Sequence, residues 1–146
     1  MRIKHCTLCA HEGWLALRVA LWPGSDMDET LLNAPERNLV LTFNDANGHV
    51  VGFAEASIRK DYVNGTSTSP VAFLEGLYVA PASRGLGIAR QLVAAVEQWA
   101  GKMGCTELAS DALLENTGSH AMHESLGFAE TERVVYFLKP LATSEA

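Results

Sequence analysis

The sequence predicts an α/β fold, a central twisted mixed sheet flanked by helices, with elements in the order β-α-α-β-β-β-α-β-α-β. Two patterns predict this class. Short strand-like runs interchange with segments whose apolar residues recur at helical spacing. In addition, an apolar run that stops at Pro81 leads through a glycine-containing loop into a helix and a further strand. Such a unit makes a right-handed crossover and leaves two strands parallel.

Each element has a local signal. Trp14, Leu17 and Leu21 share one helical face, and Trp22-Pro23-Gly24 ends that helix. Ala46-Asn47-Gly48 is a hairpin turn between two strands. The predicted elements are a strand at 2–8, a helix from about 10 to 22, a second helix from its candidate N-cap at 25 to about 35, strands at 38–44, 50–58 and 71–79, a helix at 88–99, a strand at 105–110, a helix at 117–126 and a last strand at 131–138.

The length and charge of the chain limit its class. A chain of 146 residues can bury a core, and we expect one domain over residues 1–141 with a frayed tail at 142–146. No apolar run approaches the roughly 20 residues of a membrane span, and no signal peptide is recognised, so we expect a cytoplasmic protein. The formal net charge of −6 argues against nucleic-acid binding and suits a cationic partner.

The three cysteines suggest neither a disulfide framework nor a metal site. An odd number without a secretion signal argues against paired cysteines. Cys6 and Cys9 have the spacing of a zinc or redox pair, but no second pair or histidine cluster completes four ligands. We therefore expect no metal, and buried or inactive thiols.

The loop after the strand at 71–79 is the first candidate ligand site. Gly85 and Gly87 precede a helix whose N-terminus offers unpaired N–H groups and partial positive charge. Such a backbone suits phosphate, but a strand-to-helix turn would also use glycine for its dihedral angles. No Gly-Lys-Ser/Thr follows, which excludes a Walker loop, and the third glycine of a dinucleotide-binding fingerprint would fall on Arg90. Asp111 is expected at the same carboxyl edge of the sheet, where ligands of such units bind.

The loop also carries a family resemblance. Arg84-Gly85-Leu86-Gly87-Ile88-Ala89 matches the Arg/Gln-x-x-Gly-x-Gly/Ala pattern of the GCN5-related N-acetyltransferases. Asn116-Thr117-Gly118-Ser119, followed by Leu126-Gly127-Phe128, is similar to their second acetyl-CoA element. The order of elements is similar over nearly the whole chain. The resemblance implies that main-chain N–H groups of residues 84–89 bind the pyrophosphate of acetyl-CoA, the cosubstrate.

Blocks outside this loop resemble the aminoglycoside 6′-N-acetyltransferases. They lie at residues 21–24, 56–65, 73–76, 109–111 and 130–134, in the parts of the fold that choose the acceptor. The resemblance implies acetyl transfer from acetyl-CoA to the 6′-amine of an aminoglycoside antibiotic, by direct attack in a ternary complex, which confers resistance. It also implies a homodimer.

Glu75 and Asp111 are the candidate bases, because the acceptor amine must lose a proton and a carboxylate can take it, directly or through water. On simple alternation Glu75 would share a face with Phe73 and Leu77, which disfavours a charge unless Gly76 marks a β-bulge. In the family such a bulge splays the strand, which would free the N–H groups near Leu77 and Val79 for the cofactor and the developing oxyanion. The alternatives are a solvent-facing bulge carboxylate for Glu75 and an ordinary loop aspartate for Asp111.

Two residues of the predicted 117–126 helix region are further candidates. His123 stands where many members of the superfamily have a tyrosine thought to protonate the departing thiolate; an imidazole can do the same, but a packed or solvated histidine is the alternative. Asn116 is a candidate for binding the pantetheine amides, and a helix N-cap is its alternative.

Trp22 and Tyr62 are candidate walls of the acceptor cleft, because sugar rings pack on aromatic faces; core packing is the alternative. Glu132 is a third acid for the acceptor, unless it is a solvated strand residue. With Glu75 and Asp111 it would suit a polycation.

The sequence leaves two other functions open. One is an acetyltransferase for another small cationic amine or a peptide N-terminus, and the other is a non-catalytic acyl-CoA-binding module.

Overall fold

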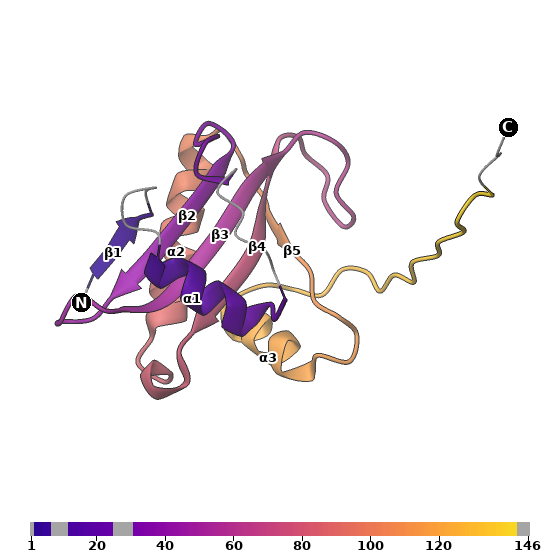
Figure 1. Ribbon diagram of the computed structural model, residues 1–146. Helices are drawn as coiled ribbons and strands as arrows, with labels where there is room; N and C mark the ends of the chain where they lie inside the picture. Colours follow the sequence, from indigo (N-terminus) through magenta and orange to yellow (C-terminus); the bar gives the residue numbers. More distant parts are fainter. Residues whose placement is uncertain (1, 7–11, 25–30, 143–146) are drawn as a thin grey trace, which may run out of the picture.

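The computed structural model describes residues 2–6, 12–24 and 31–142. Its elements are β1 (Arg2–His5), α1 (Glu12–Leu21), β2 (Asn38–Asn44), β3 (Val50–Arg59), β4 (Val71–Val79), the 3-10 helix η3 (Pro81–Ser83), α2 (Ile88–Lys102), β5 (Leu108–Ser110) and α3 (Thr117–Ser125) (Figure 1). The strands form one sheet in the order β1-β2-β3-β4-β5, antiparallel as far as β4 and parallel between β4 and β5. The predicted mixed sheet and its crossover through α2 are confirmed.

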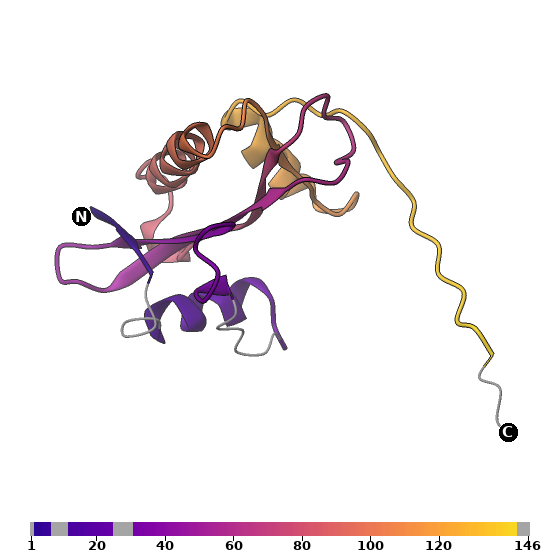
Figure 2. The same cartoon turned by 90° about the horizontal axis from the view of Figure 1, so that it is seen from above.

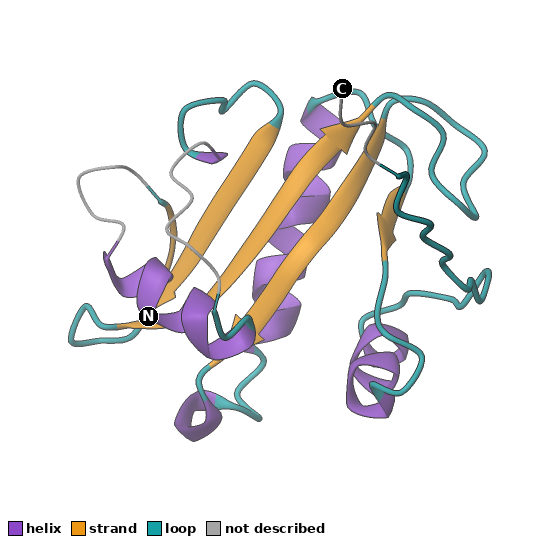
Figure 3. Ribbon diagram, turned by 45° about the vertical axis from the view of Figure 1, so that its right-hand side comes forward, coloured by secondary structure: helices purple, strands orange, loops and turns teal. Residues whose placement is uncertain are grey.

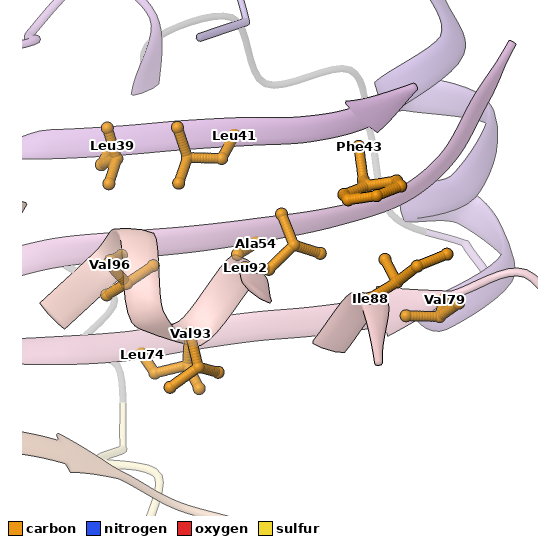
Figure 4. Packing of buried hydrophobic residues seen from close by; sticks show 11 residues of the cluster. Leu39, Leu41, Phe43, Ala54, Leu74, Val79, Ile88, Leu92, Val93 and Val96 are labelled. Atoms are coloured by element: carbon orange, nitrogen blue, oxygen red, sulfur yellow. The ribbon is translucent and has the colours of Figure 1, made fainter. Parts of the chain in front are cut away.

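Helices α1 and α2 cover opposite faces of the sheet (Figure 2). The larger core lies under α2, because its apolar stripe packs against the sheet residues that point to that side (Figure 4). Each of the larger side chains in this core, valine, leucine, isoleucine or phenylalanine, contributes about 1.5–3 kcal/mol by leaving water. The cluster consists of Leu39, Leu41, Phe43, Ala54, Ala56, Leu74, Val79, Ile88, Leu92, Val93 and Val96. On the α1 side a smaller cluster of Trp14, Val40 and Phe53 is buried.

Several predicted boundaries differ from the structure. Helix α2 runs three residues further than expected, and the strand expected at 105–110 is reduced to β5. The predicted second helix lies partly outside the described residues; its described part, residues 31–35, forms turns and not an α-helix. Cys9 and residues 143–146 of the predicted tail also lie outside the described residues. No helix within the described ranges is long and apolar enough to cross a membrane.

The strand predicted at residues 131–138 is wrong for the single chain. These residues are extended and exposed, and they lead away from the sheet (Figures 1 and 2). Phe137 is 93% exposed and Leu138 is 91% exposed. Alternating apolar residues favour an extended backbone, but a strand also requires a neighbouring edge, and these residues reach none within the described chain. We call residues 130–142 the C-terminal arm.

Candidate active site

The glycine loop joins β4 to α2 and leaves open space above its backbone. Gly85 and Gly87 have φ values of +81° and +80°, a conformation that requires glycine, so the turn explanation holds for both. A Cβ at either position would meet no atom within 4 Å. Gly87 is the N-cap of α2 and has no side chain to bind the first N–H groups of the helix. The loop therefore leaves room for a ligand beside its main chain and the start of α2, as the family resemblance predicts for pyrophosphate.

The remaining side chains of the loop support the structure around it. Ile88 is buried, and Ala89 packs against the same cluster under α2. Arg84 turns back along β4, where its Nε donates to the Val79 carbonyl oxygen over 2.8 Å. Leu86 is exposed. The side chains of Arg84, Ile88 and Ala89 are thus engaged with the surrounding structure, so a ligand at this loop would rely on its main chain.

A β-bulge interrupts the pairing of β3 with β4 at Glu75. Glu55 lies opposite Gly76 and Ala56 lies opposite Leu74, so Glu75 is the extra residue. The bulge places the Glu75 carboxylate beside β3, where Oε1 accepts hydrogen bonds from Ser57 Oγ at 2.6 Å and from Arg59 Nη2 at 2.8 Å. The bulge inferred from Gly76 is thus present, and it resolves the conflict between the charge and the apolar alternation.

Strands β4 and β5 part at the residue that precedes Glu75. Their parallel register ends with Leu74 opposite Ser110, and Ser110 Oγ donates to the Leu74 carbonyl oxygen at 3.2 Å. The next residues of the two strands are Glu75 and Asp111. The two candidate bases therefore stand on either side of the point where β4 and β5 diverge, which we call the fork. Figure 3 shows β5 beside only a short part of β4.

Beyond the fork, one edge of β4 pairs with no strand of the described chain, although the Val79 carbonyl oxygen on that edge accepts from Arg84 Nε. The Ala80 N–H binds the Val51 carbonyl oxygen and faces β3. Because backbone groups in a strand alternate between its two edges, the groups of Val79, and of Leu77 two residues earlier, face away from β3. This is the orientation that cofactor and oxyanion binding at Leu77 and Val79 requires.

Helix α3 lies beside the end of β5, to which it is linked through His123 and Ser110. The Asn116 side chain caps it by accepting from the Ser119 N–H at 3.1 Å, so the N-cap alternative is realised. Both ring nitrogens of His123 are engaged: Nε2 lies 2.8 Å from Ser110 Oγ, and Nδ1 lies 2.7 Å from the Ser119 carbonyl oxygen. The ring also meets Phe128 edge-on. His123 thus ties α3 to the end of β5, which favours packing over proton donation.

The two aromatic candidates, Trp22 and Tyr62, differ in burial and in what lies beside them. Trp22 is half-buried and lies over the bulge, since a Cβ on Gly76 would come within 2.5 Å of its Cη2. Tyr62 is 76% exposed in the loop between β3 and β4. In that loop Gly65 packs against Thr131, so the start of the C-terminal arm, with Glu132 next in the chain, touches the Tyr62 loop. Glu132 is exposed and lies on no strand.

Sequence reasoning missed a buried carboxylate on the α1 side. Glu55 accepts from Trp14 Nε1 at 3.3 Å and from Arg18 Nε at 3.0 Å. Burial raises the pKa of Glu55, while the charge and hydrogen bond of Arg18 and the Trp14 hydrogen bond lower it. Burial, followed by the charge of Glu55, raises the pKa of the nearby Cys6 thiol to about 11, which leaves that thiol protonated near neutral pH.

The missed residues had a signal in the sequence. A glutamate inside the apolar run of β3 indicates a buried charge in need of a partner. Ser57 and Arg59 follow at the spacing that puts them on the same face as Glu55. Among the described residues no group of three His, Cys, Asp or Glu side chains could hold a metal ion.

A model of the Acetyltransferase (GNAT) family matches residues 8–128. The aminoglycoside N(6′)-acetyltransferase type 1 of Acinetobacter genomosp. 13 is 55% identical in an alignment of length 133 residues, and the match covers 86% of this chain and 89% of that protein. The protein of the same name from Stenotrophomonas maltophilia is 48% identical in an alignment of length 145 residues, and the match covers 97% of this chain and 95% of that protein.

Solved structures agree with the sequence relatives. The crystal structure of aminoglycoside antibiotic 6′-N-acetyltransferase AAC(6′)-Ih from Acinetobacter baumannii has a TM-score of 0.86 and 48% identity, and the match covers 97% of this chain and 99% of that chain. AAC(6′)-Iy in complex with the bisubstrate analog CoA-S-monomethyl-acetylneamine has a TM-score of 0.86 and 44% identity over 96% of this chain and 98% of that chain. The chain therefore belongs to the GNAT acetyltransferase family, which confirms the resemblance carried by the glycine loop.

Proposed function

We propose that this protein transfers the acetyl group of acetyl-CoA to the 6′-amino group of aminoglycoside antibiotics and thereby confers resistance. The observation that carries this proposal is the fork between β4 and β5, where Glu75 and Asp111 each follow the last residue that pairs β4 with β5, and β4 continues toward the glycine loop. Similarity to aminoglycoside 6′-N-acetyltransferases over nearly the whole chain, not only in the glycine loop, supports this acceptor over a polyamine or a peptide. The use of acetyl-CoA also favours the cytoplasm as its location.

Acetyl-CoA, when bound, supplies an acetyl thioester at the fork. The acceptor nitrogen attacks its carbonyl carbon, the carbon–sulfur bond breaks, the nitrogen loses one proton and the departing thiolate gains one. Glu75 and Asp111 hold the cationic amines of the acceptor, and one of them takes the proton, directly or through water. N–H groups of Leu77 and Val79 orient the thioester and stabilise the developing oxyanion. Holding both reactants together supplies much of the acceleration.

The remaining candidates have supporting roles in this scheme. The thiolate of a thiol with a pKa of about 8.5 is a fair leaving group, so no strong acid is needed and His123 serves as a link between α3 and β5. Asn116, whose side-chain oxygen caps α3, is assigned to the pantetheine amides through its remaining amide group. Trp22, Tyr62 and Glu132 contribute to the acceptor side.

Release of free CoA thiol from acetyl-CoA tests the function. Kanamycin and tobramycin should give rapid release, whereas spermidine and a peptide N-terminus should not. Paromomycin, with a 6′-hydroxyl, should be turned over very slowly or inhibit competitively. NMR of the product should show acetyl on the 6′-nitrogen. Acetylation of a different ring nitrogen, or no release with any aminoglycoside, would contradict the proposal.

We further infer that the protein is a homodimer in which the C-terminal arm of each copy adds to the sheet of the other. The arm exposes five large apolar side chains, Val135, Tyr136, Phe137, Leu138 and Leu141, at 74% or more. Burying each one stabilises an assembly by about 1.5–3 kcal/mol. In the described sheet β5 is the last strand beyond β4, so its outer edge is available. Two arms exchanged about a two-fold axis would satisfy both edges.

Sedimentation equilibrium tests the dimer. The wild-type chain should be dimeric at micromolar concentration, and Phe137→Glu should shift it toward the monomer. Leu114→Glu, at a residue 60% exposed outside the arm, is the matched control and should remain dimeric. A monomeric wild-type protein, or a Phe137→Glu dimer as tight as the wild type, would contradict the exchange.

A further inference from the structure

A buried ion pair lies on the α1 face of the sheet beside the bulge and takes no direct part in the proposed chemistry. The Glu55 side chain is 3% exposed, and that of Arg18 is 14% exposed. Glu55 is the register partner of Gly76, the residue after Glu75. The pair therefore stands next to the fork, on the side that α1 covers.

Stability alone does not account for this pair. Taking two charges out of water costs several kcal/mol, and apolar residues of similar volume usually stabilise a fold as well or better. The same face of the sheet carries the buried cluster of Trp14, Val40 and Phe53, and the Trp14 indole N–H donates to Glu55. A role in positioning neighbouring side chains would account for a charged pair in this place.

The contacts of Arg18 show what is held. Its guanidinium carbon lies 5.8 Å from the ring centre of Trp14 and 4.9 Å from that of Trp22. Trp14 is fully buried, but Trp22 follows the end of α1 and is half-buried. The Trp22 indole meets Phe53 edge-on at 6.4 Å and fills the space over Gly76. Arg18 is thus the charged contact of an indole that lies on the bulge.

We propose that Arg18 and Glu55 are positioning residues for acceptor binding: Glu55 fixes the guanidinium of Arg18, and Arg18 fixes the Trp22 indole over Gly76. This inference rests on the proposed function, in which Trp22 borders the acceptor. Without the pair, the indole leaves the bulge and an aminoglycoside binds less tightly. Acetyl-CoA binding is retained, because it depends on the main chain of the glycine loop on the other side of the fork.

The double variant Arg18→Met/Glu55→Gln separates positioning from stability. Its melting temperature should stay close to that of the wild type, because no unpaired charge is left and the glutamine oxygen can still accept from Trp14 Nε1. Its KM for tobramycin should rise at least about fivefold, with an unchanged Kd for acetyl-CoA by calorimetry. Glu12→Gln, at an exposed residue of the same helix, is the control and should change neither constant. An unchanged tobramycin KM in the folded double variant overturns the proposal.

A second variant and a spectroscopic measurement keep the proposal testable if the double variant does not fold. Arg18→Lys keeps the charge but loses the planar group that stacks on the indoles, so the same rise in KM is expected, and its absence overturns the proposal. The chain has three tryptophans, and in protein carrying 5-fluorotryptophan the Trp22 resonance is assigned with Trp22→Phe. In either pair variant this resonance should shift or broaden while that of Trp99 stays. A Trp22 resonance that does not move overturns the proposal. Because this signal requires no turnover, it is readable even if the wild type fails to acetylate aminoglycosides.

Discussion

The two sides of the fork are built by different means. On the proposed coenzyme side, the glycine loop and the unpaired edge of β4 present main-chain groups, while Ile88 and Ala89 belong to the core. On the proposed acceptor side, the candidates are side chains from the end of α1, β4, the β3–β4 loop and the residue after β5. A main-chain site is encoded within a few consecutive residues. A side-chain site depends on the whole fold, and it is therefore the part that can change its acceptor while the coenzyme side stays the same.

The largest effect is expected when a charged side chain is placed in the glycine loop, where the coenzyme is proposed to bind main-chain groups. Gly87→Glu adds a carboxylate where pyrophosphate is expected to lie, in open space above the loop. The affinity for acetyl-CoA should fall by at least about 100-fold, roughly 2.8 kcal/mol, through charge repulsion and loss of the backbone conformation. Calorimetry with acetyl-CoA measures it.

The chain offers a matched control for that experiment. Gly104 also has a positive φ, +84°, and a Cβ there would also meet nothing within 4 Å. Gly104→Glu therefore carries the same backbone strain and the same added charge at the far end of α2. It should bind acetyl-CoA like the wild type. Near-normal binding by Gly87→Glu would remove the loop from the coenzyme site.

On the acceptor side, the corresponding changes should leave acetyl-CoA binding intact. Glu75→Gln and Asp111→Asn keep size but lose the charge and the base at the fork. Each should lower kcat/KM for tobramycin by at least about tenfold, roughly 1.4 kcal/mol, in steady-state assays. Glu36→Gln, at an exposed residue before β2, is the control. Full activity of both fork variants would mean that the acceptor does not bind at the fork.

This difference also decides what the sequence could predict. Residues 84–89 were predicted as a coenzyme site because their sequence resembles the GNAT pattern; the glycines alone left a phosphate site and an ordinary strand-to-helix turn equally open. The bulge at Glu75 was inferred because a charge and Gly76 interrupt an apolar strand. By contrast, the pairing of Glu75 with Ser57 and Arg59 follows only from the register of β3 with β4, and the pairing of Glu55 with Arg18 follows only from the packing of α1 on the sheet; these contacts join residues 16 to 37 positions apart. The last strand was predicted wrongly for the single chain because alternation specifies an extended backbone and not its neighbour.

We expect His123 to contribute to stability and not to the chemical step. Both of its ring nitrogens bind groups of β5 and α3, so His123→Ala should lower the melting temperature by a few degrees through lost hydrogen bonds worth about 1 kcal/mol each. The single-turnover rate should change by less than about threefold between pH 6 and 9, as rapid-quench measurements would show. His123→Gln, which can keep one of the two hydrogen bonds, should restore part of the stability. A large loss of single-turnover rate with normal stability would instead make His123 the acid.

The smallest expected effect concerns the buried carboxylate beneath the bulge and is a change in the pH dependence of stability. Burial raises the pKa of Glu55 above its usual value, against the opposing effect of Arg18. A group with a raised pKa in the folded state contributes stability that is fully present below its unfolded pKa, about 4.3 for glutamate, and is lost as pH rises through the folded value. The free energy of unfolding of the wild type minus that of Glu55→Gln should therefore decrease as the pH rises above about 4.3. Carboxyl groups such as Asp45 and Glu107, whose pKa values are lowered by hydrogen bonds, are common to both proteins and cancel in this difference. Urea unfolding at a series of pH values from about 4 to about 7 measures it. A difference that grows with pH would mean that the attraction of Arg18 outweighs burial, and that the pair contributes to stability as well as to the position of Trp22.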